Sequence, residues 1–380
     1  MRRIASSTSR SVSEMSSVKE MKPKERALAA LSGEKTDCLP TYPIACGVCR
    51  RFIGDGHMKY SEWCNDPEKF AEAFLQGQKH FNMDFAIGLM DLSVMAGDLG
   101  AHVRMDEQNT PFVDGHIIHS MEDYEKLEVP DITKGRTGVL IKGTELIAKK
   151  LKDQVVTSAF VEGPLLALSQ TAGAEQLFMD MFSDPKPIHK ALEVTTEYDK
   201  QIVEALGKTG IEALCWDYLW GNYACLGDQE YGEFEGDKYA PFLNEQTKKN
   251  SMAVAIHNCA DLPHLDTQIK KFKPSLYSMA YYPLIAGSPT AAETIEKGYS
   301  DHCLVAGNLD PQIFMRDTPA QCEEATKNLC QEVKTALCKR GLNSGYCIAS
   351  GCEVPPSVNC RLEDIKAVVD ADRKYGRMEY

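Results

Sequence analysis

The sequence predicts an α/β protein with the fold of a (β/α)8 barrel, also called a TIM barrel. Three observations support this prediction: eight short apolar or β-branched runs typical of strands, amphipathic stretches between most of them, and a length of 380 residues that one barrel can occupy. Strands that alternate with helices form a parallel sheet with crossover connections. Because the runs are apolar throughout, a closed barrel covered by helices accounts for them better than an open sheet.

The expected elements follow one another regularly along the chain. A first helix is predicted over residues 23–34, with Pro23 near its start and Gly33 near its end. The eight predicted strands are LPTYPI (39–44), MDFAIGL (83–89), VVTSAFV (155–161), IEALCWD (211–217), MAVAIHN (252–258), PSLYSMA (274–280), HCLVAGN (302–308) and GYCIAS (345–350). Helical spacing of apolar residues predicts helices in DPEKFAEAFLQGQKHF, EYDKQIVEALGKTG and PAQCEEATKNLCQEVKTALCKRG.

Two segments interrupt the alternation of strands and helices. Residues 98–130, rich in Asp, His and Pro, are expected to form a lid or an excursion over the barrel mouth. Residues 221–240, with repeated Gly, Tyr and Glu, are expected to form a second such loop. Side chains just beyond the C-terminal ends of the strands share this mouth, so functional residues that are distant in sequence meet there.

The composition disfavours two kinds of partner. Hydrophobic residues make up 43% of the chain and charged residues 26%, and the apolar runs are too short to cross a bilayer, so no membrane partner is expected. The net charge is −13, and no cluster of Lys and Arg of the kind that binds phosphates is present, so no nucleic-acid partner is expected. A homodimer is among the states that the sequence allows.

The cysteines and the first residues bear on the compartment. Fourteen cysteines without a cleavable secretory signal indicate a reducing compartment, the cytoplasm, in which they remain free thiols. Residues 1–22 are expected to be a flexible leader before one catalytic domain over residues 23–380. The stretch MRRIASSTSRSVSEMSSVK is basic and Ser-rich, so an organelle targeting segment is the alternative.

The short stretch IHNCAD places an imidazole and a thiol at the end of a predicted strand. His257 and Cys259 are two residues apart, so on a strand both side chains point to one side, and zinc favours this pair of ligands. H-x-C alone is a weak signal, and a third ligand is needed. Cys352 follows the eighth predicted strand and faces the mouth, whereas Cys347 lies within that strand and is expected to be buried. The alternative is three unrelated thiols and a core histidine.

At these residues the sequence resembles a known family. IHNCAD together with ASGCEVPPSVNCRLEDIKAVVDA resembles the paired signature of the uroporphyrinogen decarboxylase-like superfamily, in its zinc methyltransferase branch. The resemblance spans residues 24–377 and includes MDLSVMAGDLGAHV, EGPLLALSQTAGAEQLFMDMFSDP and AGNLDPQIFMRDTP. It implies a (β/α)8 barrel in which His257, Cys259 and Cys352 hold Zn2+ and leave the fourth tetrahedral position open, as catalytic zinc sites do.

The resemblance implies methyl transfer to or from the cobalt of a corrinoid (cobalamin). The corrinoid-binding motif D-x-H-x-x-G is missing, since its nearest match, DGHIIH, ends in His119, so the corrinoid is expected on a partner protein. The favoured reaction is O-demethylation of a methoxylated aromatic, because many aromatics lie in mouth segments: Tyr42, Trp216, Tyr218, Trp220, Tyr223, Tyr281 and Tyr282. The alternative is a methylcobamide:coenzyme M methyltransferase, with a thiol as the methyl acceptor.

Two further readings stay open. A uroporphyrinogen-type decarboxylase binds an octacarboxylate through spaced arginines near the first strand. In this chain that region, YPIACGVCRRFIGDG, has only the adjacent pair Arg50 and Arg51, for which solvent is the ordinary place. A zinc-binding or corrinoid-docking protein without turnover shares the same ligands, although a purely structural zinc needs a fourth one.

Two acids complete the candidate site. Asp91 matches the acid that the superfamily places after its second barrel strand and is expected to bind the substrate or orient a proton donor. Asp217 ends the fourth predicted strand and has a similar expected role. The alternative for Asp91 is an N-cap or a salt-bridged barrel acid.

Overall fold

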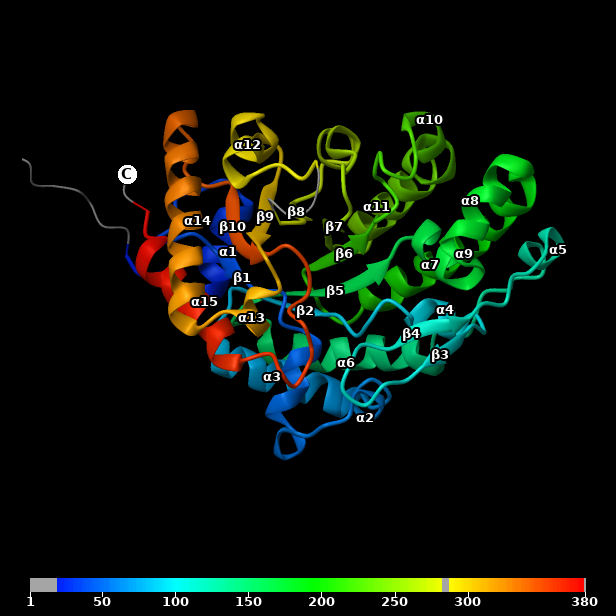
Figure 1. Ribbon diagram of the computed structural model, residues 1–380, viewed down its shortest axis with the longest axis horizontal. Coiled ribbons are helices and arrows are strands. Elements are labelled where there is room, and N and C mark those ends of the chain that lie inside the picture. The colour runs from blue at the N-terminus through cyan, green and yellow to red at the C-terminus, as the bar shows by residue number, and fades with distance from the viewer. Residues whose placement is uncertain (1–18, 282–286, 379–380) are drawn as a thin grey trace, which may run out of the picture.

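The computed structural model describes residues 19–281 and 287–378. Eight parallel strands form one sheet that curves into a barrel, in the order β1-β10-β9-β8-β7-β6-β5-β2 (Figure 1). The strands are β1 (Thr41–Tyr42), β2 (Phe85–Gly88), β5 (Val156–Glu162), β6 (Ala213–Asp217), β7 (Ala253–Asn258), β8 (Leu276–Met279), β9 (Leu304–Leu309) and β10 (Tyr346–Ser350). Each overlaps one of the eight predicted runs, so the predicted (β/α)8 barrel is confirmed.

A helix follows each strand and packs on the outside of the sheet (Figure 1). In chain order these are α3 (Pro67–Phe81), α6 (Gly135–Leu151), α9 (Pro185–Leu206), α11 (Tyr239–Lys249), a π-helix (Asp266–Lys271), α12 (Ala291–Glu296), α14 (Pro319–Arg340) and α15 (Leu362–Tyr375). The predicted first helix is α1 (Pro23–Leu31). Local sequence defines helix ends: at α3 the Asp66 side chain accepts hydrogen bonds from two backbone N–H groups, and Asn82 adopts a left-handed conformation.

Shorter elements lie in the connections between strands and outer helices. They are the 3₁₀ helices Gly47–Phe52, Gly54–Gly56 and Tyr299–Asp301, the helices α2 (Tyr60–Trp63), α4 (Val94–Asp98), α5 (Met121–Tyr124), α7 (Pro164–Ala172), α8 (Ala174–Ser183), α10 (Asp228–Tyr231) and α13 (Ile313–Arg316), a π-helix (Gly232–Gly236), and the strands β3 (His102–Arg104) and β4 (Phe112–Gly115).

The two segments predicted as loops differ in outcome. Residues 98–130 form the predicted excursion, because β3 and β4 pair as an antiparallel hairpin away from the barrel sheet (Figure 1). The loop prediction for residues 221–240 was wrong, since much of this segment is helical, from α10 through the π-helix into α11. Its aromatics explain why: Tyr231, Phe234 and Tyr239 share one buried cluster, which helical spacing brings to one side.

The first and second strands meet at a seam between the two ends of the sheet order. The Asp84 backbone N–H donates to the Thr41 carbonyl (3.2 Å), and the Thr41 N–H donates to the Asp84 carboxylate (2.7 Å). The same carboxylate pairs with Arg26 (2.7 Å) and Arg373 (2.9 Å), both on helices outside the sheet. A buried carboxylate therefore completes the ring where β1 provides only two residues to the sheet.

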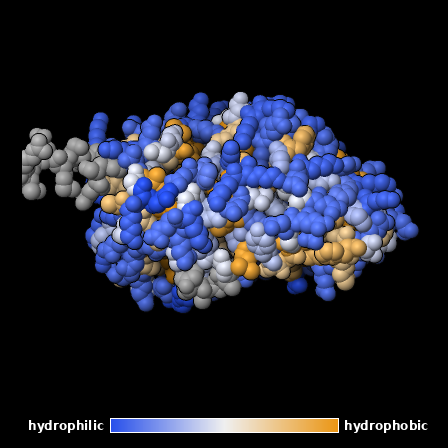
Figure 2. All heavy atoms as spheres, turned by 90° about the horizontal axis from the view of Figure 1, so that it is seen from above, coloured by the Kyte–Doolittle hydropathy of each residue, from blue (hydrophilic) through white to orange (hydrophobic). Residues whose placement is uncertain are grey.

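The barrel and its outer helices bury one large apolar core, while the face seen in Figure 2 is mostly hydrophilic. All 14 cysteines are free thiols, as the composition predicts, and Cys347 is buried as expected. In the described ranges, no helix is long and apolar enough to cross a membrane. Residues 1–18 of the predicted leader lie outside the described residues. Near the end of the leader, the Met21 backbone N–H donates a hydrogen bond to the Asp37 carboxylate (2.9 Å).

The expectation that Arg50 faces solvent was wrong. Arg50 is 0% exposed, and its guanidinium donates to the backbone carbonyls of Pro356 (2.7 Å) and Gln108 (2.6 Å). It also lies against the ring of Tyr60, with the guanidinium carbon 5.2 Å from the ring centroid. Arg50 thus joins the segment after β10 to the segment that connects β3 and β4.

Replacing Arg50 tests this structural role. We expect Arg50→Met to lower the free energy of unfolding by about 3 kcal/mol, because buried carbonyls from two segments lose their donor. Arg51→Met is the matched control: Arg51 is half-exposed, and its replacement is expected to cost within about 1 kcal/mol. Equilibrium urea denaturation measures both, and equal losses would contradict the role assigned to Arg50.

Candidate metal centre

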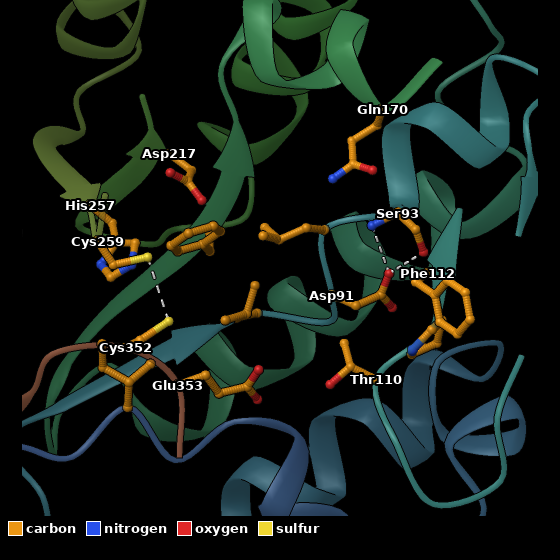
Figure 3. A pocket seen from close by; sticks show the side chains of 15 residues that line it. Asp91, Ser93, Thr110, Phe112, Gln170, Asp217, His257, Cys259, Cys352 and Glu353 are labelled. Atoms are coloured by element: carbon orange, nitrogen blue, oxygen red, sulfur yellow. Dashed lines mark hydrogen bonds between the residues drawn. The ribbon is translucent and has the colours of Figure 1, made fainter. Parts of the chain in front are cut away.

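Two segments that are distant in the sequence bring three metal-binding side chains together. His257 lies near the end of β7, Cys259 just beyond that end, and Cys352 two residues after β10. One ligand atom from each lies within 4.8 Å of the others, and the two sulfurs are 3.7 Å apart although 93 residues separate them in the chain (Figure 3). The structure thus brings together all three ligands predicted from the sequence.

The chain around each ligand explains this placement. Beside His257, the Asn258 side chain donates to the carbonyls of Tyr218 (3.0 Å) and Gly221 (2.9 Å) and accepts from the Ala260 N–H (3.0 Å), which fixes the turn that carries Cys259. Beside Cys352, Gly351 approaches the next loop so closely that a Cβ there would lie 2.3 Å from the Tyr281 nitrogen.

The donor set fits a zinc ion. Tetrahedral zinc with Zn–S bonds of about 2.3 Å separates two sulfurs by roughly 3.8 Å, close to the 3.7 Å between Cys259 and Cys352. That separation is far too long for a disulfide bond. The Nδ1 atom of His257 is hydrogen-bonded to the Ser278 hydroxyl (2.9 Å), which leaves Nε2 for a metal. His257 is buried and both cysteines are half-buried, so the site is sheltered from bulk solvent.

The protonation of the three ligands is linked. The hydrogen bond between the two thiols lowers the pKa of Cys352 well below its usual range. Burial acts in the opposite direction, but contact with His257 lowers the pKa further. The same pair interaction, together with burial, raises the pKa of Cys259. Burial opposes a charge on His257, but Cys352 and Asp217 outweigh it and raise its pKa. The cluster therefore favours one thiolate, the form that binds metal.

Asp217 adjoins the cluster, as its position at a strand end predicts. It is the last residue of β6 and lies opposite His257 in the register of the parallel strands. It is 1% exposed, and its Oδ1 atom has no hydrogen-bond partner among the described residues. Burial raises its pKa to about 7; His257 opposes this shift and Cys352 adds to it.

Glu353 is a site residue that sequence reasoning missed. Its carboxyl group points toward the same cavity as Cys352 (Figure 3), and it accepts a hydrogen bond from the Gly47 N–H (2.7 Å). Burial raises its pKa to about 8, against the effect of that hydrogen bond. Its place next to Cys352, after a strand end, was the only signal, and it does not distinguish this acid from ordinary surface acids.

Asp91 lies across the cavity from the three ligands (Figure 3). Its carboxylate is ion-paired with the buried Arg136 and accepts hydrogen bonds from the Ser93 N–H (2.9 Å) and hydroxyl (2.6 Å). The structure thus places Asp91 in the salt bridge that was its alternative, and also in the cavity wall. A role in substrate binding stays a prediction.

A cavity of about 300 Å³ extends from the ligand cluster to Asp91. Besides the cluster, its lining has a polar part (Asp91, Ser93, Thr110, Gln170, Asp217 and Glu353) and an apolar part (Ile44, Leu89, Leu92, Pro111, Phe112 and Phe160). Thr110, Pro111 and Phe112 come from the β3–β4 excursion, which therefore forms part of the cavity wall as predicted.

The prediction that aromatics gather around the substrate was wrong for most of the residues named. Tyr42, Trp216 and Tyr218 are buried in the barrel core, with Trp216 and Tyr218 stacked on each other. Among the described residues, only Phe112 and Phe160 bring aromatic carbocycles to the cavity, and neither was predicted to do so. Tyr282 lies outside the described residues.

Comparison with known proteins places nearly the whole chain in a family. The family model described as uroporphyrinogen decarboxylase (URO-D) matches residues 22–375. The chain is 21% identical to the methylcobamide:CoM methyltransferase MtbA of Methanosarcina acetivorans, over 82% of this chain and 89% of that protein. It is 28% identical to a uroporphyrinogen decarboxylase of Flavobacterium johnsoniae, over 45% of this chain and 51% of that protein.

A solved structure shows the same fold. This chain superposes on a methyltransferase from Methanosarcina mazei with a TM-score of 0.77 and 18% sequence identity. The superposition covers 94% of this chain and 99% of that structure. At that identity the likeness concerns the fold. Because the family model matches nearly the whole barrel, the chain belongs to the uroporphyrinogen decarboxylase (URO-D) family.

Proposed function

We propose that this protein is a zinc-dependent methyltransferase that moves a methyl group from the corrinoid of a separate protein to a small thiol. The observation that carries the proposal is the convergence of His257, Cys259 and Cys352 on the wall of a cavity, with three ligands and room for a fourth. The relative from M. acetivorans, a methylcobamide:CoM methyltransferase, supports this direction of transfer.

The residues of the chain have separate tasks in this reaction. His257, Cys259 and Cys352 would hold zinc, and Ser278 fixes the orientation of the imidazole ring. Zinc bound there would keep the substrate sulfur deprotonated at neutral pH. Asp217, whose Oδ1 is unpartnered, accepts the proton that the thiol loses. The sulfur then forms a bond to the methyl carbon, and the electron pair of the broken cobalt–carbon bond stays on cobalt.

O-demethylation is the second candidate. The apolar part of the cavity, with Leu89, Leu92 and Phe160, would accept the ring of a methoxylated aromatic. This reading has less support than the sequence suggests, because none of the described aromatic side chains on which it rested lines the cavity. Uroporphyrinogen itself has still less support: the lining has no arginine or lysine among the described residues for an octacarboxylate.

Metal content tests the ligand set. We expect about one zinc per chain in the wild type and less than about a tenth of that in Cys259→Ser and Cys352→Ser, because two remaining ligands hold zinc weakly. The control is Cys338→Ser, an exposed cysteine outside the cluster, which should keep its zinc. Elemental analysis gives the stoichiometry, and equal zinc in all four proteins would refute the site.

The hydroxyl of Ser278 should affect zinc affinity without being a ligand. We expect Ser278→Ala to weaken zinc binding about tenfold, because the imidazole loses the hydrogen bond that orients it. Competition with a chromophoric chelator measures the affinity. Ser158→Ala replaces another buried strand serine, whose hydroxyl bonds only to the Ala159 carbonyl among the described residues, and should leave the affinity unchanged. An unchanged affinity in Ser278→Ala would remove this role.

Methyl transfer is tested with methylcobalamin and small thiols. We expect the wild type to demethylate methylcobalamin, with the methyl group recovered as a thioether, and the activity to fall at least about a hundredfold when zinc is removed. Circular dichroism of the metal-free protein checks that the barrel persists. Methoxybenzene with reduced cobalamin is the competing assay: transfer in that assay alone would replace the thiol reaction with O-demethylation.

A further inference from the structure

The cavity has polar groups at both ends. Asp217 and Glu353 flank the ligand cluster, and Asp91, Ser93, Thr110 and Gln170 lie at the far side (Figure 3). Within the described ranges, the Thr110 hydroxyl and the Gln170 side-chain amide have no hydrogen-bond partner, and neither has the Oδ1 atom of the buried Asp217. The Thr110 hydroxyl and the Gln170 amide are therefore free to bind the part of a substrate that does not react.

Outside the candidate metal ligands, the ionisable side chains of this lining are all acids. It contains three carboxyl groups and, among the described residues, no lysine or arginine. Two arginines, Arg136 and Arg50, lie close to the cavity lining, but both guanidinium groups already have hydrogen-bond partners in the protein. Arg136 is ion-paired with Asp91 and donates to Ser93 (3.1 Å), and Arg50 donates to backbone carbonyls. No free guanidinium or ammonium in the described part of the chain faces the cavity.

This distribution of charge selects among substrates of the same shape. An anionic group that leaves water for a cavity of this kind loses its hydration and finds no countercharge. An anion is disfavoured in either protonation state of the acids, because a carboxylate repels an anion and a carboxylic acid carries no positive charge. A hydroxyl or ammonium group, in contrast, can donate hydrogen bonds to the carboxylates and to the Gln170 carbonyl oxygen.

We propose that the thiol bound in this cavity carries an uncharged or cationic polar group, and that thiols with an anionic group are discriminated against. The inference rests on the function proposed above and specifies the class of its substrate. Asp217 and Glu353 determine the charge selectivity at the metal end of the cavity, and Thr110 and Gln170 bind the polar group at the far end.

Three thiols with the same two-carbon backbone test the proposal: 2-aminoethanethiol, 2-mercaptoethanol and 2-mercaptoethanesulfonate. Binding to the cobalt(II)-substituted enzyme is followed by the sulfur-to-cobalt charge-transfer absorption, corrected for the thiolate fraction of each compound in solution. We expect the dissociation constant of the sulfonate to exceed those of the other two by at least about tenfold, because the sulfonate meets acidic groups and no countercharge in the cavity. Methyl transfer from methylcobalamin should follow the same order in kcat/KM.

A change of charge at the far end should reverse the order. In Gln170→Lys we expect the sulfonate to bind about tenfold more tightly than in the wild type and 2-aminoethanethiol to bind more weakly. 2-Mercaptoethanol has no charge, so its unchanged affinity shows that the variant is folded and the metal site intact. Gln176→Lys, on the exposed side of α8, is the matched control and should leave all three affinities unchanged.

The outcomes separate this inference from the function on which it rests. Equal or tighter binding of the sulfonate by the wild type would overturn the inference while the methyltransferase function stands. Absorption changes with none of the three thiols, together with no methylated thiol, would overturn the proposed function and this inference with it. If Gln170→Lys leaves the order of the three dissociation constants unchanged, the polar group of the thiol does not bind at Thr110 and Gln170.

Discussion

The backbone hydrogen bonds that hold β10 between β9 and β1 are the constraint on which the candidate metal centre depends. Ile348 lies opposite Thr41 on one side and Gly307 on the other, so the last strand of the barrel is fixed against the first. Cys352 leaves the end of that strand at the same mouth as His257 and Cys259, which follow β7. Strand pairing, with no local sequence motif, brings the two cysteines to 3.7 Å.

The pairing of neighbouring strands also explains why acids gather near the candidate metal ligands. Glu162, Asp217 and His257 occupy matching positions at the ends of three adjacent strands, and the next strand adds Ser278 in the same row. Such a row places carboxyl groups where water is excluded, and burial raises the pKa values of Glu162 and Asp217. One row of strand-end residues therefore supplies His257 of the candidate metal site and Asp217 of the cavity wall.

Much of this architecture could be predicted from the sequence, because its signals are local. Continuous apolar runs predict the strands, and His257 and Cys259 at the end of one strand predict two candidate ligands. The rest depends on contacts that the order of residues does not reveal. Arg50 is buried only because carbonyls of residues 108 and 356 fold onto it. Glu353 becomes a site residue only through the cavity that the β3–β4 excursion helps to enclose.

The seam at Asp84 makes the tolerance of the barrel to mutation uneven around its circumference. Seven junctions between neighbouring strands consist of backbone ladders, which any residue except proline can continue. At the eighth junction, one backbone hydrogen bond is supplemented by the carboxylate of Asp84, which also binds two arginines from outer helices. At seven junctions the pairing of the strands does not depend on the identity of a side chain, whereas at the eighth one residue determines how the ring closes.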